Sequence, residues 1–468
     1  MDSSPRVIIF PFPAQGHVNS MLKLAQLLSL SNVQVTFLVT VDTHDRLLNH
    51  TDVISRFGSG FHLQPLPHGI SMDVMNTRDG LSILYDSLNK IAKPFLREFI
   101  AYSPVTTCLI TDGILSMAAD VAQEINLPII YFRTASASSF WSYFCMPDLI
   151  QVGELPLKEN AKDLTLTKVK GMEDFLRGRD LPSFCQASDL TSPDFRIVMT
   201  ETRQTPRARG LILNTFEDLE GPILSQIRTV CPNVYTIGPV HAHLKAKLGT
   251  KSTSSNSLWQ EDESCMSWLD TQPPKSVIYV SFGSVAGLTK EELLEFWYGI
   301  VNSEQKFLWV MRPDLIIGQE RKDEIPVELE QGTKARGYMA DWVPQEKVLA
   351  HRAIGGFLTH SGWNSTLESI VEGVPMICWP RFADQQVNSR FVGEVWKMGL
   401  DIKDTCDRDI IAKSIRDLME KRNGEFSQRT EHMANLAKKA VNEGGSSYIN
   451  LDRLIQDIRS ITPPHKQT

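Results

Sequence analysis

The hydrophobic pattern at the start of the chain alternates short apolar runs with amphipathic stretches. Residues 6–10 and 33–40 form apolar runs of the length expected for buried strands, and the apolar positions of residues 19–30 recur at helical spacing. Because parallel strands need a crossover connection, this order predicts a doubly wound α/β domain. Further strands of this domain are predicted at residues 106–110, 128–132, 210–216 and 233–240.

Prolines and glycines interrupt this pattern at three places. Residues 11–17 contain two prolines and a glycine and are predicted to form a loop. The helical pattern of residues 81–100 contains Pro94, which lacks an amide N–H and should break or kink the helix. Residues 149–205 have no regular period, and we predict irregular structure with short helices around an acceptor pocket.

The alternation returns in the second half of the chain and predicts a second α/β domain. Strands are expected at residues 276–281 and 307–311. The helix between them should run from residue 289 to about residue 303, because Thr289 and Glu292 have the spacing of a capping box.

Composition changes between the two halves. Residues 241–257 contain three lysines and a Ser/Thr/Asn run, which predicts an exposed, flexible linker. We therefore divide the chain into an N-terminal domain at 1–244, a linker at 245–257, a second domain at 258–446, and a C-terminal helix at 447–468.

The overall composition narrows the class of protein. The chain has 468 residues, 42% of them hydrophobic, and a net charge of −7, which argues against nucleic acid or an anionic membrane as the main partner. Seven scattered cysteines without a CxxC pair indicate a reducing compartment, with neither a disulfide framework nor a zinc site. The first residues do not resemble a signal peptide, and we find no apolar run of about 18 residues that could span a membrane. These features predict a cytoplasmic enzyme.

Residues 342–385 contain the strongest functional signal. An apolar run at residues 355–358 leads into Thr-His-Ser-Gly and then into a helix with Asn364 or Ser365 in its first turn. Such a turn presents backbone N–H groups and the positive end of a helix, which suits a phosphate. Glu368 lies on the same helix face and can accept hydrogen bonds from both hydroxyls of a ribose. The pattern predicts a nucleotide site.

Residues 342–385 closely resemble the signature box of the plant secondary-product glycosyltransferases, which use UDP-sugars. The main departure is Ser361, where most of the family has Cys, and a small residue is retained. The alternative, a buried βαβ unit without a ligand, does not explain the polar and aromatic residues of the box together. The resemblance covers nearly the whole chain and implies the GT-B fold, with two Rossmann-like domains facing a cleft and the last helix returning to the first domain.

The resemblance also implies roles for the donor-binding residues. Uracil would contact Trp342 and Gln345, and the ribose would contact Glu368. The diphosphate would contact Ser284, His360, Asn364 and Ser365, and the sugar would contact Trp363, Asp384, Gln385 and Thr134. Core packing for the two tryptophans, and a helix cap for the last Asp, are the alternatives. A Gln can offer vicinal hydroxyls both a donor and an acceptor, and Gln at the end of the box accompanies glucose preference in the family. The implied donor-binding residues are Thr134, Ser284, Trp342, Gln345, His360, Trp363, Asn364, Ser365, Glu368, Asp384 and Gln385.

His17 and Asp112 are the candidates for catalysis. His17 follows the first strand, and Asp112 lies at the C-terminal end of another, on the edge where α/β sheets place ligands. A surface histidine and a helix N-cap are the alternative interpretations. Together they can form a pair in which the carboxylate orients the imidazole. FPAQGHVN and LITDG match the family's catalytic loops, which implies a metal-independent inverting transfer with His17 as base, UDP-glucose as co-substrate and no cofactor.

The acceptor is less well defined. Arg133 departs from the family, in which many members have Trp before the threonine, and YFRTASASSFW resembles the subgroup that glucosylates iridoids such as 7-deoxyloganetic acid. Arg133 can pair with an acceptor carboxylate, or it can bond backbone carbonyls or a neighbouring acid. Candidates for an apolar acceptor pocket, each of which can equally be a core residue, are Phe12, Phe140, Phe144 and Phe382.

Our leading hypothesis is a monomeric inverting glucosyltransferase that acts on a hydroxyl or carboxyl of a small hydrophobic metabolite. An iridoid or other terpenoid is the expected acceptor, and the product is a β-glucoside. The alternatives are a flavonoid or phenolic glucosyltransferase, another nucleotide-sugar enzyme such as an epimerase, and a non-catalytic UDP-sugar-binding protein. The last of these would have no need of His17 and Asp112.

Overall fold

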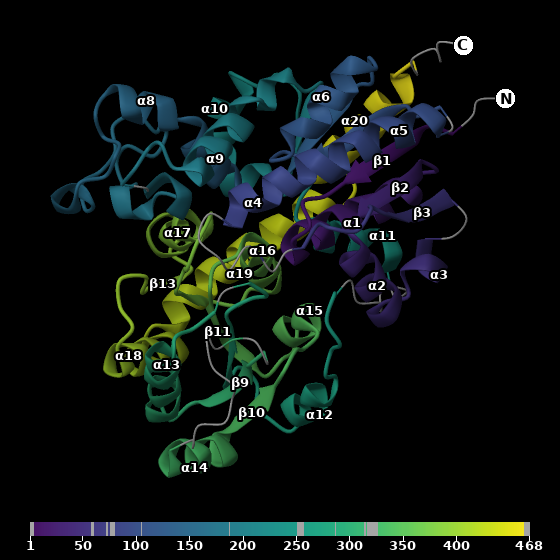
Figure 1. Ribbon diagram of the computed structural model, residues 1–468. Coiled ribbons are helices and arrows are strands. Elements are labelled where there is room, and N and C mark those ends of the chain that lie inside the picture. Colours follow the sequence, from purple (N-terminus) through teal and green to yellow (C-terminus); the bar gives the residue numbers. More distant parts are fainter. Residues whose placement is uncertain are drawn as a thin grey trace. The chain divides into compact units, whose positions relative to one another are not determined.

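The computed structural model (Figure 1) describes residues 4–57, 60–71, 74, 80–103, 105–186, 188–249, 257–285, 287–312, 315 and 326–462. The chain divides into two compact units. The first comprises Met1–Leu258 and Lys438–Thr468, and the second comprises Trp259–Ala437. Each unit is built on one parallel sheet, as the sequence predicts for an α/β fold.

The sheet of the first unit has seven strands in the order β3-β2-β1-β4-β5-β6-β7. Its strands are almost entirely buried, as expected for a parallel sheet with both faces covered. The strand order reverses between β1 and β4, and such a switch point is where α/β sheets bind ligands. The bounds are Arg6–Phe10 (β1), Gln34–Val39 (β2), Phe61–Pro65 (β3), Cys108–Asp112 (β4), Ile129–Arg133 (β5), Gly210–Leu213 (β6) and Val234–Thr236 (β7).

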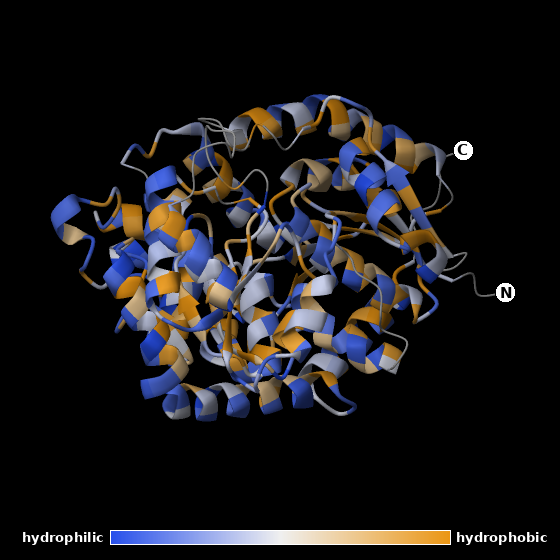
Figure 2. Ribbon diagram, turned by 90° about the horizontal axis from the view of Figure 1, so that it is seen from below, coloured by the Kyte–Doolittle hydropathy of each residue, from blue (hydrophilic) through white to orange (hydrophobic). Residues whose placement is uncertain are grey.

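The helices of the first unit cover this sheet and carry mixed hydrophobic and hydrophilic residues (Figure 2), which is typical of amphipathic helices. They are α1 (Gln15–Ser29), α2 (Val41–His50), α3 (Val53–Phe57), α4 (Gly80–Ser87), α5 (Lys93–Tyr102), α6 (Ser116–Glu124), α7 (Ala137–Phe144), α8 (Met146–Gln151), α9 (Pro193–Arg203), α10 (Glu217–Arg228), α11 (Val240–Leu248) and α20 (Ser446–Ser460). Residues 72–73 and 75–79 lie outside the described part of the chain.

Helix α1 begins earlier than predicted. The sequence places its start at residue 19 and His17 in the preceding loop, but the helix starts at Gln15, so His17 lies in its first turn. Pro13 is the last proline of this segment. The next residue, Ala14, already has the extended backbone of an N-cap. The loop prediction for residues 15–17 was therefore wrong.

The predicted break at Pro94 is confirmed. Helix α4 passes into a π-helical turn at Leu88–Ala92 before α5 begins, and Pro94 lies in the first turn of α5. Proline lacks an N–H and crowds the carbonyl four residues earlier, so the regular α-helical ladder cannot pass through it. Asn89 satisfies one displaced carbonyl by donating from Nδ2 to the Tyr85 oxygen at 3.0 Å.

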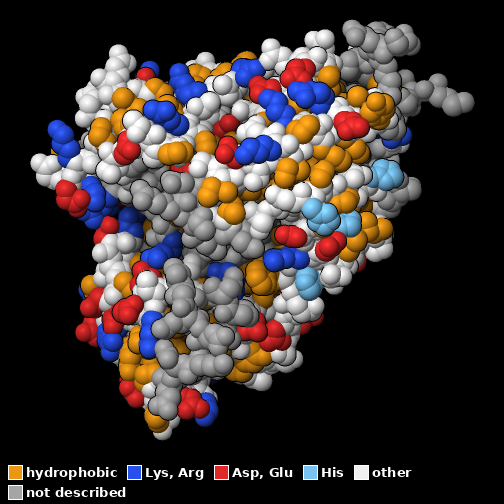
Figure 3. Space-filling model, viewed as in Figure 1, with side chains coloured by type: hydrophobic (Ala, Val, Ile, Leu, Met, Phe, Trp, Pro, Cys, Tyr) orange, Lys and Arg blue, Asp and Glu red, His pale blue; other side chains and the backbone are white. Residues whose placement is uncertain are grey.

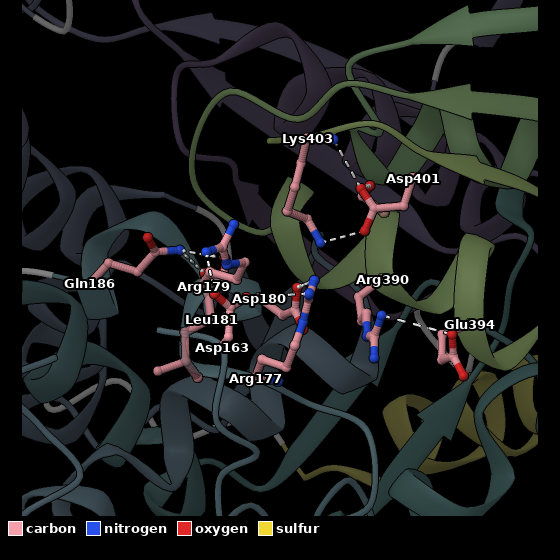
Figure 4. Close-up of polar contacts among 11 residues, drawn as sticks. Asp163, Arg177, Arg179, Asp180, Leu181, Gln186, Arg390, Glu394, Asp401 and Lys403 are labelled. Atoms are coloured by element: carbon pink, nitrogen blue, oxygen red, sulfur yellow. Dashed lines mark hydrogen bonds and ion pairs between the residues drawn. The ribbon is translucent and has the colours of Figure 1, made fainter. Parts of the chain in front are cut away.

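Charged hydrogen bonds hold much of the irregular region between α8 and α9 (Figure 4). Asp180 is fully buried and accepts from Nε and Nη2 of Arg177 at 2.9 and 2.8 Å. Arg179 donates to Asp163 at 2.6 Å, and Gln186 donates to the Leu181 carbonyl at the same distance. The region ends in α9, which has 11 residues and is longer than the short helices predicted there.

The second unit contains a six-stranded parallel sheet in the order β10-β9-β8-β11-β12-β13. Its strands are β8 (Val277–Ser281), β9 (Lys306–Val310), β10 (Gly337–Ala340), β11 (Ile354–Thr359), β12 (Met376–Cys378) and β13 (Gly399–Asp401). Its helices are α12 (Ser264–Asp270), α13 (Lys290–Asn302), α14 (Val327–Arg336), α15 (Gln345–Leu349), α16 (Trp363–Glu372), α17 (Gln385–Arg390) and α18 (Arg408–Arg416), and α19 (Asn423–Val441) begins in this unit. The capping box is confirmed, since Thr289 and Glu292 exchange both hydrogen bonds at the start of α13.

The segment predicted to be a flexible linker is partly helical. Helix α11 covers the first part of the predicted range, and its residues His241 to Leu244 are buried. Two of the three lysines that suggested a linker, Lys245 and Lys247, lie in the last turn of this helix, where positive charge stabilises the helix end. Residues 250–256 lie outside the described part of the chain.

Helix α20 packs against strand β7 of the first unit. The Tyr235 hydroxyl lies 2.5 Å from Oδ2 of Asp457, and Ser447 donates to the carbonyl of Gly238.

Acidic and basic side chains are interspersed on the face shown in Figure 3. Within the described ranges, no helix is both long enough and apolar enough to cross a membrane.

Candidate active site

His17 and Asp112 form a hydrogen-bonded pair at the switch point of the first sheet. Nδ1 of His17 lies 2.6 Å from Oδ2 of Asp112. The carboxylate is buried, whereas the imidazole is 29% exposed. An ionised carboxylate only accepts hydrogen bonds, so Nδ1 carries the proton and Nε2 is the nitrogen that can act as a base.

The pairing of β1 with β4 brings these two residues together. Phe10 and Thr111 are partners in the register of the two strands, so the segments that follow them leave the sheet side by side. The backbone amides of Phe12 and Ile114 also donate to Asp112, at 3.4 and 3.3 Å. The carboxylate is therefore fixed in position.

Thr134 lies beside the same pair. Its hydroxyl oxygen is 2.8 Å from Nδ1 of His17, and the residue directly follows β5, the neighbour of β4 in the sheet. The expected contact between Thr134 and the donor sugar stays a prediction. The structure shows a second polar partner for the imidazole, which restricts rotation of the ring.

The second unit presents a turn suited to a phosphate. Strand β11 ends at Thr359, Ser361 has a left-handed backbone with φ of 63°, and α16 follows after Gly362. The side chain of Asn388 donates to the Ser361 carbonyl at 2.9 Å and fixes the turn. The first backbone N–H groups of α16 have no partners within the helix, so they can bind an anion.

His360 lies between two glycines that leave room for its ring. A Cβ added to Gly283 or Gly362 would come within 2.4 or 2.5 Å of its Nε2, so any side chain there would displace the imidazole. Burial lowers the pKa of His360 to about 4, against the opposing effect of the Ser281 backbone and with a further contribution from the Arg312 guanidinium. His360 is therefore neutral at pH 7, so its ring carries one N–H and no charge.

Three residues of the box form one hydrogen-bonded group. Nε2 of Gln345 donates to Oγ of Ser365 at 2.9 Å and to Oε2 of Glu368 at 2.7 Å. Oε1 of Gln345 accepts from the Tyr279 hydroxyl at 3.1 Å. The structure therefore brings together the residues expected at the uracil, the phosphate and the ribose. Tyr279 was missed, because it lies inside an apolar strand with no polar pattern around it.

The two tryptophans of the box differ in their surroundings. Trp342 is partly exposed, and its ring centroid lies 6.0 Å from that of Trp259. Trp363 is 4% exposed and packs near Trp396. Most of the Trp363 side chain is therefore packed in the core, whereas Trp342 retains an accessible ring surface for stacking.

Gln385 has a structural role in its own loop. Oε1 accepts from the backbone amides of Arg381 and Phe382 at 2.8 and 3.1 Å. Only Nε2 is left for a sugar hydroxyl, so the prediction that Gln385 offers both a donor and an acceptor must be revised. Asp384, at the N-cap of α17, accepts from Asn388 at 2.9 Å.

Three of the four phenylalanines proposed for the acceptor pocket lie in the first unit and are buried. The ring of Phe12 lies 5.2 Å from that of His17, which places an apolar surface next to the base. Phe144 packs against Trp141 and the Arg203 guanidinium and is a core residue in this environment. Phe140 is also buried, and Phe382 is partly exposed on the second unit.

Arg133 bonds the protein itself. Its Nη2 donates to the backbone carbonyl of Glu201 at 3.1 Å and to Oγ1 of Thr205 at 3.4 Å. The residue is 5% exposed. Of the two roles left open for it, bonding a backbone carbonyl is the one that the structure shows.

A second buried arginine was missed by the sequence analysis. Arg312 is 3% exposed and donates from Nη1 to the Ser284 carbonyl at 2.8 Å. It thereby supports the loop that contains Gly283 and lies next to His360. An arginine that closes an apolar strand is the signal that could have identified it.

Comparisons with known proteins agree with this geometry. Residues 98–423 match the family described as "UDP-glucoronosyl and UDP-glucosyl transferase", and residues 4–47 match "Glycosyltransferase, N-terminal domain". The 7-deoxyloganetic acid glucosyltransferase of Catharanthus roseus is 57% identical, with 98% of each chain covered. The myricetin 3-O-rhamnoside 1,2-glucosyltransferase of Crocosmia x crocosmiiflora is 41% identical, covering 99% of this chain and 97% of that protein.

Solved structures give the same result. The crystal structure of Os79 from O. sativa in complex with UDP superposes with a TM-score of 0.80 at 28% identity, covering 97% of this chain and 100% of the other. The chain belongs to the UDP-glycosyltransferase family and has the GT-B fold.

The neutral state of His360 predicts a pH-dependent affinity for the donor. A bound diphosphate raises the pKa of His360 from its value of about 4, because an adjacent anion favours the imidazolium. Binding then takes up a proton at low pH, so affinity for UDP-glucose should increase as pH falls from about 7.5 to 5.5. Calorimetric titration of UDP-glucose measures this, and UDP is avoided because its terminal phosphate titrates near pH 6.

The His360→Gln variant should bind more weakly and show a flatter pH dependence. His351→Gln, which removes an imidazole beside Asp270 on the same unit, serves as the matched control and should keep the wild-type slope. The pKa of His360 in the folded protein lies below its unfolded value of about 6.5. The unfolded state therefore takes up a proton more readily, and the free energy of unfolding falls as pH falls. Folding is therefore checked at each pH, and a wild-type slope in His360→Gln would contradict the prediction.

Proposed function

We propose that the protein transfers glucose from UDP-glucose to a hydroxyl of a small terpenoid, with inversion at the anomeric carbon. The observation that carries the proposal is the 2.6 Å hydrogen bond between His17 and Asp112 in a chain that also contains the phosphate turn of α16. A UDP-sugar-binding protein without catalysis would have no use for a base oriented in this way.

The proposed reaction assigns a role to each of these groups. Nε2 of His17 removes the proton of the acceptor hydroxyl, and the Asp112 carboxylate stabilises the imidazolium that forms. The acceptor oxygen attacks the anomeric carbon from the face opposite UDP, so an α-linked donor gives a β-glucoside. UDP leaves with its charge stabilised by the amides at the start of α16 and by the neutral N–H of His360.

An iridoid acceptor is supported by the relative from Catharanthus roseus, whose name states that it acts on 7-deoxyloganetic acid. The apolar surface that Phe12 places next to His17 suits the hydrocarbon face of a compact terpenoid. A flavonoid acceptor is the second candidate, supported at lower identity by the relative that acts on a myricetin rhamnoside. We expect the enzyme to act in the cytoplasm, where its seven cysteines stay reduced.

Replacing the base should remove most of the activity. His17→Ala is expected to lower kcat by about 10²–10⁴-fold while UDP-glucose binding stays near normal. Asp112→Asn should give a smaller loss, because Asp112 orients and stabilises the base. Steady-state kinetics with an iridoid acceptor measure both effects.

A second histidine–aspartate pair provides the control. Nδ1 of His44 lies 3.0 Å from Oδ1 of Asp45 on α2, so His44→Ala removes a similar contact elsewhere in the same unit. It should retain wild-type turnover. If folded His17→Ala turns over as fast as His44→Ala, the assignment of the base is wrong.

Sugar choice should depend on Nε2 of Gln385. We expect a higher kcat/KM with UDP-glucose than with UDP-galactose. Gln385→Glu keeps an oxygen for the amides of Arg381 and Phe382 but removes the N–H donor, so it should lower kcat/KM for UDP-glucose without a large change in Tm. Gln386→Glu is the matched control. Equal kcat/KM for the two sugars in the wild type, or a preference for galactose, would refute the expectation.

The acceptor class is tested by a side-by-side panel. Iridoids, flavonols and phenolic acids are compared at equal concentration, and products are identified by mass and NMR. We expect the highest kcat/KM with a 7-deoxyloganetic acid-type iridoid and a β-O-glucoside as product. Clearly better rates with flavonols would favour the second candidate.

A further inference from the structure

Arg133 lies directly behind the catalytic pair. It is the last residue of β5, which pairs with β4 so that Asp112 is the partner of Phe132. The Arg133 side chain crosses the backbone next to Asp112: a Cβ added to Gly113 would lie 2.5 Å from its Nε and 2.6 Å from its Cδ. Only a glycine after Asp112 leaves space for this side chain.

The guanidinium connects the Asp112 loop to helix α9. Its Nη2 donates to the Glu201 carbonyl, while the Glu201 carboxylate accepts from the amide and hydroxyl of Ser116 at 2.6 and 2.7 Å. Ser116 is the first residue of α6, three residues beyond Gly113. The short loop after Asp112 therefore has Arg133 packed at one end and is tied to Glu201 at the other.

More carboxylates than cations lie around Arg133. Two buried carboxylates, Asp112 from β4 and Glu201 from α9, interact with the guanidinium of Arg133. The other titratable groups that interact with it are the phenols of Tyr85 from α4 and Tyr131 from β5 and the thiol of Cys231. Burial raises the pKa of both phenols, so they stay neutral.

Removing the guanidinium would leave two buried carboxylates without a compensating charge. Burial already raises the pKa of Glu201, against the opposing effects of Ser116 and Arg133. A buried charge that loses its partner is strongly destabilised, and one carboxylate of such a pair takes up a proton.

We propose that Arg133 is a positioning residue for the His17–Asp112 pair, which places a positive charge beside the Asp112 carboxylate and anchors its loop to α9 through Glu201. The inference rests on the proposed function, in which this pair is the catalytic base. It assigns no acceptor contact to Arg133. The residue therefore affects the chemical step instead of acceptor binding.

The pH dependence of kcat/KM tests this role. In Arg133→Met the acid limb should move to higher pH by about one unit or more, because removing a cation favours the more protonated form of the site around it. The fall in kcat at neutral pH should be about tenfold, with KM for the acceptor near the wild-type value. Arg133→Lys keeps the charge and should restore much of the profile.

Glu201→Gln provides a test with the opposite sign. The amide oxygen of Gln can still accept from Ser116, but the negative charge is gone, so the acid limb should move to lower pH. In the double variant Arg133→Met, Glu201→Gln, the profile should return towards the wild type. Arg207→Met, which removes an exposed cation just after α9, is the matched control and should leave the profile unchanged.

Three outcomes would overturn the proposal. The first is a wild-type pH profile in Arg133→Met. The second is an acid limb of Glu201→Gln that moves to higher pH or does not move. The third is a raised KM for the acceptor with unchanged kcat in Arg133→Met. If Arg133→Met does not fold, Arg133→Lys and Glu201→Gln still decide the question. Activity in His17→Ala would refute the proposed function, whereas an inactive His17→Ala with a normal Arg133→Met profile would refute this inference alone.

Discussion

The parallel pairing of β1 with β4 is the constraint on which the candidate catalytic centre depends. His17 and Asp112 are far apart in the sequence, yet the register of these two central strands brings the segments that follow them side by side. The strand order reverses at this point, and such a reversal is where α/β sheets bind ligands. Each further partner of the pair, from Phe12 to Thr134, comes from a segment that leaves the same sheet edge.

Distant carboxylates hold the helices around this centre. Glu201 accepts from the amide and hydroxyl at the start of α6, and Glu220 from α10 accepts from the amides of Ala137 and Ser138 at the start of α7. The first amides of a helix have no partners within it, and a carboxylate there also interacts favourably with the helix dipole. Burial raises the pKa of both carboxylates. The contacts that hold the helices therefore come with a free-energy cost, which is the desolvation of the ionised carboxylates.

The second unit solves a different problem, which is to present N–H groups to an anion. The left-handed backbone at Ser361 turns the chain sharply between β11 and α16, and Gly283 and Gly362 leave room for His360 against the backbone. The neutral imidazole and the backbone amides are donors that carry no charge of their own. Such donors suit the diphosphate site that we propose here.

The sequence by itself determined the two parallel sheets, the capping box at Thr289, the break at Pro94 and the candidate site residues, because periodicity, caps and motifs are local properties. It did not determine that α11 replaces part of the linker or that α1 starts before His17. Only the tertiary structure decided that Arg133 bonds Glu201 and that Gln385 bonds its own loop. Both outcomes depend on which buried donors and acceptors become neighbours when distant segments pack, and a sequence pattern carries no record of that.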